Sequence, residues 1–315
     1  MTAAHLPDAP PDNWVDRHAP LSLRPWLKLG RFDRPIGAWL LMLPGWQAVA
    51  LGGAMHGRTP DLRLLALIAA GAFVMRAAGC AYNDIVDRDY DAKVARTATR
   101  PIPAGQISVK QAWAFLVALS LIGLAILLML NPLAIALGVG SLLLVAAYPF
   151  MKRVTWWPQA WLGLTFNWGA VLGYAAATGT LGWPALLLYA SGLFWTLGYD
   201  TIYAAQDMED DALVGVRSSA LRLGSSAPRA VLGFYAACVI LAVAAGAAAG
   251  LGPLFLPLLA LYAAQLGWQG SRFRIEDGPG ALGLFKSNRT AGLILFMAMI
   301  AGMWGRAGPA WGLLT

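Results

Sequence analysis

Nine long apolar stretches constrain this chain more than any other feature of its 315 residues. Each stretch has about 18 to 22 residues, enough for a helix to cross the roughly 30 Å hydrocarbon core of a bilayer. Only 12% of the residues are charged, against about a quarter in soluble domains. The sequence therefore predicts an all-α polytopic membrane protein, a nine-transmembrane-helix bundle. The predicted spans are residues 36–55, 64–82, 112–130, 132–150, 160–178, 184–204, 230–249, 253–270 and 290–311.

The residues before the first span divide into two segments. Residues 1–20 are rich in Pro and Asp and lack an apolar core, so we expect a disordered cytoplasmic tail and no secretory signal. Residues 21–35 mix apolar residues with Arg and Lys, which predicts a short amphipathic helix in the headgroup region with its cations toward anionic lipid. Residues 36–311 are expected to form a single membrane domain of two pseudo-repeats, about 36–150 and 160–270, plus a final helix.

The distribution of Lys and Arg predicts the orientation in the membrane. With nine spans, 19 of the 23 cationic residues fall on the side that carries the N-terminus. Cationic loops stay on the cytoplasmic side, so we expect a cytoplasmic N-terminus and an external C-terminus. The same topology explains the basic character of the chain without a nucleic-acid partner.

The acidic residues are concentrated in two places in this basic chain. Nine of the 16 Asp and Glu residues lie in the windows 83–91 and 200–211, each at the cytoplasmic end of a predicted span. Asp84, Asp87 and Asp91 are spaced to share one face of a helix. Asp200, Asp207 and Asp211 are also spaced to share one helical face. The two windows are similar to each other, which indicates an internal repeat.

Two interpretations of these windows are open. Helix ends often meet water, where acidic residues are common. However, acids at the carboxyl end of a helix oppose its dipole and repel one another unless a cation is present. Carboxylate and amide oxygens without nearby His or Cys are the ligands that Mg²⁺ prefers, and Mg²⁺ is commonly shared with substrate phosphates. The windows therefore predict a diphosphate held between metal ions.

Cationic residues accompany the acids on the same side of the membrane. Positive-inside topology alone could account for any single one of them. A departing pyrophosphate also needs positive groups nearby, so they are candidate diphosphate contacts. The candidates are Lys93, Arg96, Arg100, Lys152, Arg153 and Arg34.

Arg76 and Asp200 are charged residues inside predicted spans. Each lies seven residues before a member of its acidic window, about 10 Å deeper along the helix. A cation inside a span costs at least about 2.5–3.5 kcal/mol unless it has a partner or faces a cavity. A salt bridge between the two is one interpretation. The other is an acceptor pocket, in which Arg76 holds an anionic group and Asp200 orients or deprotonates a phenol.

Together these motifs resemble the UbiA family of intramembrane prenyltransferases, over residues 31–292. The motifs are Asn83-Asp84-x-x-Asp87-x-x-x-Asp91, Arg96-Thr97-x-x-Arg100-Pro101, Tyr148-Pro149-x-x-Lys152-Arg153 and Asp200-x-x-Tyr203-Ala204-x-x-Asp207-x-x-x-Asp211. Further residues favour the branch of the family that prenylates 4-hydroxybenzoate in ubiquinone biosynthesis. They are Asp33-Arg34-Pro35-Ile36-Gly37, Met75-Arg76-Ala77-Ala78-Gly79-Cys80 and Gly215-Val216-Arg217-Ser218-Ser219-Ala220.

The resemblance implies a helical bundle around a central cavity with cytoplasmic cap loops, in a bacterial-type inner membrane. It implies transfer of a polyprenyl group from polyprenyl diphosphate to the ring carbon beside the phenol. Mg²⁺ ligands would be Asn83, Asp84, Asp87, Asp91, Asp207 and Asp211. Arg76 would bind the benzoate carboxylate and Asp200 the phenol, with Tyr203 beside the acceptor and Lys152 assisting catalysis. The partners implied are the two substrates and the lipid bilayer, with no obligate protein partner.

Other acceptors and another class of protein compete with this interpretation. Relatives in the same family could prenylate haem, homogentisate or dihydroxynaphthoate, although Arg76 favours an acceptor with a carboxylate. A cation-coupled transporter would also contain buried acids. Transporter sites usually lie near the membrane midplane on interrupted helices, whereas these acids lie at one end of their helices and precede cationic loops.

Overall fold

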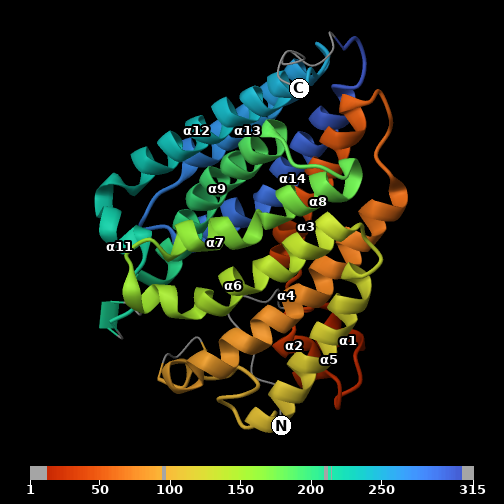
Figure 1. The fold of residues 1–315 in the computed structure, drawn as a ribbon. Helices are drawn as coiled ribbons and strands as arrows, with labels where there is room; N and C mark the ends of the chain where they lie inside the picture. Colours follow the sequence, from red (N-terminus) through yellow and green to blue (C-terminus); the bar gives the residue numbers. More distant parts are fainter. Residues whose placement is uncertain (1–12, 94–96, 209–211, 214, 307–315) are drawn as a thin grey trace. The chain divides into compact units, whose positions relative to one another are not determined.

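A computed structural model describes residues 13–93, 97–208, 212–213 and 215–306 of the chain, without the side chain of Asp207. Within these residues every regular element is a helix, which confirms the predicted all-α class. The chain divides into two compact units. Unit 1 consists of Met1–Trp39 and Ala70–Met129, and unit 2 of Leu40–Ala69 and Leu130–Thr315. Two helices, α3 (Ile36–Met55) and α4 (Leu62–Asp91), contribute to both units (Figure 1).

Unit 1 is built around the carboxyl-terminal part of α4. Its other helices are α1 (Trp14–His18), α2 (Arg24–Leu29) and α5 (Val109–Leu127). A buried apolar cluster joins α2, α4 and α5 to the segment between the last two. Its members are Leu29, Ala81, Ile85, Ile102, Ile107 and Ala112. This cluster fixes α2 and the residues after α4 against the helix that carries the first acidic window.

The segment before the first span is more ordered than the sequence predicts. Residues 1–12 lie outside the described residues, but α1 begins directly after them. Asn13 caps α1 by accepting a hydrogen bond from the Asp16 amide at 3.0 Å, and Val15 is buried. The prediction of disorder is therefore wrong for residues 13–19.

The cations of residues 21–35 were expected to face lipid. Instead Lys28 is 7% exposed and its ammonium lies 2.8 Å from the Asp16 carboxylate. This expectation is wrong for Lys28. Hydrophobic periodicity did not reveal α1, whose Asp16 supplies a carboxylate partner for Lys28.

Unit 2 contains the remaining long helices. They are α6 (Pro132–Val154), α7 (Pro158–Phe166), α8 (Trp168–Thr178), α9 (Trp183–Ala204), α12 (Ala227–Ala248), α13 (Phe255–Arg272) and α14 (Gly278–Ala301). Helix α9 packs against α7, α8, α12 and α14, and α13 lies between α12 and α14 (Figure 1). Three short helices lie between α9 and α12: η1 (Ala205–Asp207), α11 (Ser219–Leu223) and η2 (Gly224–Ser226).

One predicted span is two helices. The stretch 160–178 is interrupted at Asn167, which separates α7 from α8. The Asn167 side-chain amide donates to the carbonyl oxygen of Gly163 at 2.9 Å and to the Thr196 hydroxyl at 2.8 Å, so it links the break to α9. An asparagine inside an apolar stretch changes hydropathy little, and the break therefore escaped the prediction.

Five helical segments among the described residues are long and apolar enough to cross a membrane. They are Ile36–Met55, Leu62–Asp91, Val109–Leu127, Pro132–Val154 and Ser219–Ala248. The predicted count of nine spans is thus not confirmed: α7 and α8 are too short, and α9, α13 and α14 carry more polar and aromatic residues.

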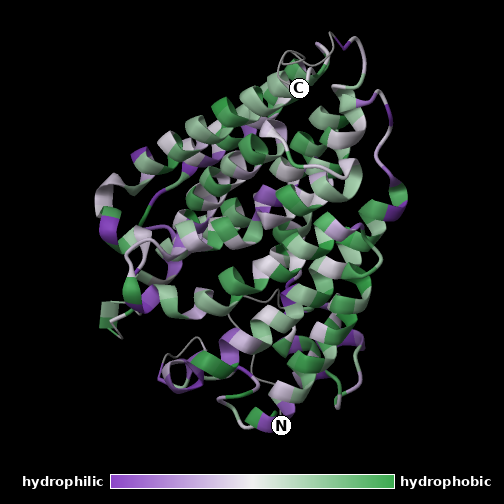
Figure 2. Cartoon of the chain, viewed as in Figure 1, coloured by the Kyte–Doolittle hydropathy of each residue, from purple (hydrophilic) through white to green (hydrophobic). Residues whose placement is uncertain are grey.

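Exposed apolar side chains support a membrane environment. In α6, Leu143 is 79% exposed, and the apolar windows of α5 and α6 are largely unburied within the chain. Lipid is the solvent that makes such surfaces stable, because water would oppose their exposure. Hydrophilic residues gather in the segment after α4 and around α11 (Figure 2), so the polar chemistry lies at helix ends.

Candidate functional site

The first acidic window forms the last turns of α4. Asp84 and Asp87 have no exposed surface and Asp91 is 7% exposed. Between them, the side chains of Arg88 and Asp89 are 48% and 77% exposed. The helix therefore separates a buried acidic face from an exposed face, as the spacing of the three aspartates predicts.

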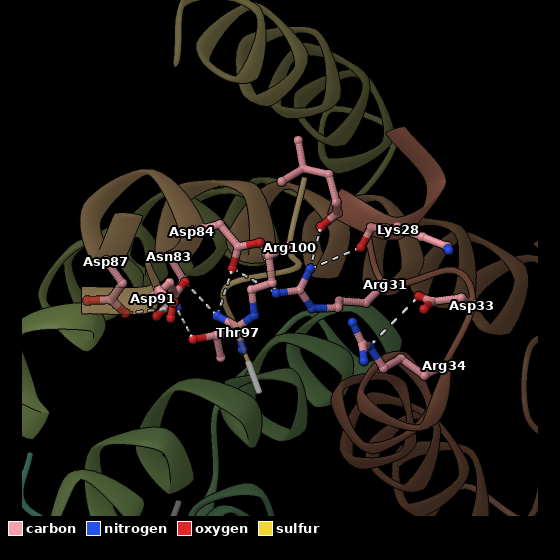
Figure 3. A network of polar contacts seen from close by, with 11 residues as sticks. Lys28, Arg31, Asp33, Arg34, Asn83, Asp84, Asp87, Asp91, Thr97 and Arg100 are labelled. Atoms are coloured by element: carbon pink, nitrogen blue, oxygen red, sulfur yellow. Dashed lines mark hydrogen bonds and ion pairs between the residues drawn. The ribbon is translucent and has the colours of Figure 1, made fainter. Parts of the chain in front are cut away.

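Two arginines neutralise this buried face (Figure 3). Arg31 approaches both Asp84 oxygens through Nη2, at 2.7 and 2.9 Å. Arg100 donates through Nη1 to Asp91 at 2.7 Å and lies 3.3 Å from Asp84. Burial by itself would lower the pKa of Arg31, but the neighbouring acidic groups, chiefly the Asp84 carboxylate, together raise it. Asp84 and Asp91 are thus paired with cations from two other segments of unit 1.

The donor set of this face suits a hard cation. Asn83 contributes an amide and donates to Asp87 Oδ2 at 3.0 Å, beside the three carboxylates. Such oxygen ligands fit Mg²⁺. However, in the part of the chain that the structure describes, no three His, Cys, Asp or Glu side chains gather as a metal-binding group. The oxygen donors of the first window suit a divalent ion, but in this structure Asp84 and Asp91 contact arginines.

The other predicted diphosphate contacts of unit 1 have different surroundings. Arg34 is largely buried, with Nε 3.8 Å from Asp33. Both Asp33 oxygens are buried without a hydrogen-bond partner, and burial raises the pKa of this carboxyl despite the nearby Arg34 and Arg31. Lys93 is exposed just after α4, and Arg96 lies outside the described residues.

Arg76 lies two turns before the acidic window on α4, with its guanidinium against Gly37 in the first turn of α3. Both residues belong to unit 1. The predicted placement of Arg76 on the helix that carries Asn83 is confirmed. Sequence patterns did not reveal the contact with Gly37, since it joins residues 39 positions apart.

The second window is less regular than the first. Asp200 and Tyr203 lie in the last turns of α9. The centroid of the Tyr203 ring lies 4.5 Å from that of the Phe285 ring. The α-helix ends at Ala204, so Asp207 falls in a 3₁₀ turn. The shared helical face predicted for Asp200, Asp207 and Asp211 stays a prediction, because the described residues do not include the side chain of Asp207. Asp211 lies outside the described residues.

Lys152 and Arg153 lie in the last turn of α6, as predicted. The Lys152 carbonyl accepts a hydrogen bond from the Arg217 amide at 3.0 Å. The Arg217 side chain donates to the Val154 carbonyl at 2.9 Å and stacks on Trp156. The segment after the second window is therefore fastened to the end of α6, a connection that the sequence did not show.

Comparison with known proteins identifies the family. A model described as the UbiA prenyltransferase family matches residues 41–300. The chain is 48% identical to the mitochondrial 4-hydroxybenzoate polyprenyltransferase of Rattus norvegicus, over 91% of this chain and 77% of the relative. It is 45% identical to the protein of the same name in Arabidopsis thaliana, over 92% of this chain and 71% of the relative.

Solved structures of UbiA homologues share the fold of this chain. A UbiA homologue from Aeropyrum pernix K1 matches with a TM-score of 0.69 and 31% identity, over 83% of this chain and 96% of the homologue. A homologue from Archaeoglobus fulgidus, solved with GPP and Mg²⁺, shares the fold with a TM-score of 0.62 at 21% identity, over 88% of this chain and 99% of the homologue.

The relatives named above are mitochondrial, so they do not support the prediction of a bacterial-type inner membrane. The match over residues 41–300 and the high identity to relatives across most of their length carry the assignment. This chain of membrane-type helices belongs to the UbiA prenyltransferase family.

Proposed function

We propose that the protein transfers a polyprenyl group from polyprenyl diphosphate to the ring carbon ortho to the phenol of 4-hydroxybenzoate, releasing diphosphate, in ubiquinone biosynthesis. The observation that carries the proposal is the buried acidic face of α4, which is paired with arginines, in a chain 45–48% identical to 4-hydroxybenzoate polyprenyltransferases. Acids and guanidinium groups packed together are the groups needed to bind a metal diphosphate.

The metal ligands proposed are Asn83, Asp84, Asp87, Asp91, Asp207 and Asp211. Their oxygen donors favour Mg²⁺, and homologues of the family have been solved with Mg²⁺ and with Cd²⁺. When bound, the ion would neutralise charge on the leaving diphosphate.

The chain's own cations would bind the rest of the diphosphate. Arginine forms paired hydrogen bonds with phosphate oxygens, and lysine adds a compact charge. The residues proposed for this role are Arg34, Lys93, Arg96, Arg100, Lys152 and Arg153. Charge that develops on the leaving group as the allylic C–O bond breaks would be stabilised by these fixed cations.

Residues that lie deeper along their helices would bind the acceptor. We assign the benzoate carboxylate to Arg76 and the phenol to Asp200, with Tyr203 beside the ring. Holding the phenol directs the allylic carbon to the adjacent ring carbon, which then loses its proton and regains aromaticity.

The proposed topology is the one predicted from the sequence. It has nine spans, and the acidic windows and the N-terminus lie on the cation-rich side of the membrane. The unequal distribution of Lys and Arg among the loops supports it. In a bacterial inner membrane this side faces the cytoplasm.

Prenylation by the purified protein in liposomes tests the function. We expect Mg²⁺-dependent prenylation of 4-hydroxybenzoate by a long-chain prenyl diphosphate, a loss of at least about 100-fold in Asp84→Asn, and normal activity in Asp89→Asn. The second variant alters an exposed acid of the same helix. Turnover of a different aromatic acceptor, with none of 4-hydroxybenzoate, would refute the proposed acceptor; full activity in Asp84→Asn would refute the metal assignment.

A further inference from the structure

Arg31 occupies an unusual backbone position. Helix α2 ends in a Schellman motif, in which the Phe32 amide donates to the Leu27 carbonyl at 2.9 Å and the Arg31 amide to the Lys28 carbonyl at 3.1 Å. The residue at the position of Arg31 in this motif adopts the left-handed conformation and is usually glycine. Here it is an arginine with φ of 59°, the one non-glycine residue with positive φ among those described. A strained residue of this kind indicates that its side chain is needed there.

The side chain of Arg31 is paired with the Asp84 carboxylate. The two Asp84 oxygens lie 2.7 and 2.9 Å from Nη2, and Nη1 donates to the Lys28 carbonyl at 3.0 Å, which fixes the direction of the guanidinium. The Asp84 carboxylate is fully buried and the Arg31 side chain is 12% exposed. A buried charge pair of this kind is weakly screened by salt, so each partner strongly affects what else can bind the other.

We propose that Arg31 is a built-in counter-cation that competes with a divalent metal ion for Asp84. The inference rests on the proposed function, in which Asp84 is a metal ligand. A divalent ion bound to Asp84 would share that carboxylate with Arg31. It would also share it with Arg100, whose Nη1 lies 3.3 Å from Asp84 Oδ1. Repulsion between the ion and the guanidinium groups weakens binding of the metal by itself.

An anionic diphosphate removes this obstacle. Its oxygens offer the guanidinium groups a new partner, so Asp84 becomes available to the metal. Metal and diphosphate therefore bind cooperatively, and by linkage each increases the affinity for the other by the same factor. The protein would thus bind the metal and the prenyl donor together.

Metal titration of the purified full-length chain in detergent tests this. Binding of Mn²⁺, a stand-in for Mg²⁺, is followed by the EPR signal of the free ion, without diphosphate and then with geranyl diphosphate after correction for Mn²⁺ that it binds in solution. The variant is Arg31→Gly, because glycine suits the left-handed backbone and preserves the end of α2. We expect it to bind Mn²⁺ about tenfold tighter than wild type without diphosphate, and the enhancement by geranyl diphosphate to fall about tenfold.

Two controls separate the possible outcomes. Arg88→Ala removes the same charge from the exposed side of α4, where Arg88 lies 3.5 Å from exposed Asp89, and its Mn²⁺ affinity should match wild type. Asp84→Asn should abolish tight Mn²⁺ binding. If Asp84→Asn binds Mn²⁺ like wild type, the metal assignment of the proposed function fails.

If Asp84→Asn loses Mn²⁺ while Arg31→Gly binds it no tighter than wild type, the metal assignment stands and the competition by Arg31 is refuted. Should Arg31→Gly not fold, Arg100→Gln tests the same competition, because Arg100 contacts both Asp84 and Asp91. Tighter Mn²⁺ binding in Arg100→Gln would support the inference, and unchanged or weaker binding would refute it.

Discussion

The guanidinium of Arg76 lies so close to Gly37 that no other residue fits at position 37 without displacing it. An ideal Cβ on Gly37 would lie 2.6 Å from Nε and 3.0 Å from Nη2 of Arg76. The first of these distances is shorter than real Cβ contacts allow. The first turn of α3 thus limits where the guanidinium of Arg76, in the middle of α4, can lie.

Gly37→Ala should therefore impair acceptor binding. If Arg76 binds the benzoate carboxylate, displacing its guanidinium by a few tenths of an ångström weakens a directional, charged hydrogen bond. We expect the KM for 4-hydroxybenzoate to rise about tenfold, with the KM for the prenyl diphosphate unchanged. Steady-state kinetics with each substrate varied in turn measures both. The matched control is Gly79→Ala on α4, where an added Cβ meets nothing within 4 Å. An equal loss for both substrates would contradict this role.

Asp33→Asn should stabilise the protein at neutral pH. Burial raises the pKa of Asp33 above its ordinary value, although Arg34 and Arg31 oppose the shift. An acid with a raised folded-state pKa destabilises the fold when charged, and the fold regains that stability as pH falls through the folded-state pKa toward the unfolded value near 4. Thermal unfolding in detergent should show a higher Tm for the variant at pH 7, and a difference that shrinks toward pH 4. Exposed Asp89→Asn should show neither effect; a lower Tm in Asp33→Asn at pH 7 would contradict the prediction.

Asp16→Asn should have the opposite effect. Burial by itself would raise the pKa of Asp16, but the hydrogen bonds from Lys28 and Asn13, together with the charges of Lys28 and Arg24, lower it. The stability from this group is present above the unfolded-state pKa near 4 and is lost as pH falls through the lower folded-state pKa. We expect a loss of at most about 1 kcal/mol at pH 7, because the pair is partly exposed, and a loss that shrinks as the pH falls below about 4. A variant as stable as wild type at pH 7 would show that the pair contributes nothing.

Gly173→Ala should destabilise unit 2. Helices α8 and α3 cross so closely that a Cβ on Gly173 would lie 2.6 Å from the Gly45 carbonyl oxygen, a backbone atom that cannot rotate away. Overpacking of this kind costs about 1–3 kcal/mol. Gly140→Ala in α6, where an added Cβ meets nothing within 4 Å, should leave stability unchanged. Comparison of the thermal unfolding midpoints in detergent measures the difference, and equal midpoints would show that the crossing can relax.

Local patterns in the sequence were sufficient for much of the fold and part of the site. The periodicity that places Asp84, Asp87 and Asp91 on one face depends only on helix geometry, and the structure buries all three. The same reasoning did not show that the α-helix ends at Ala204, where a 3₁₀ turn follows. Nor did it show the break at Asn167, whose hydrogen bond to Thr196 depends on a neighbouring helix.

The sequence by itself determined the all-α class, the apolar lengths suited to a membrane and the acidic face of α4. These follow from hydrophobicity and from the fixed rise and rotation of a helix, which act over a few neighbouring residues. Only the tertiary structure decided that Arg31 pairs with Asp84, that Arg76 lies against Gly37 and that Asp33 is buried without a hydrogen-bond partner. Such relationships join residues far apart in the chain, or depend on what surrounds a side chain, and therefore arise only when the helices pack.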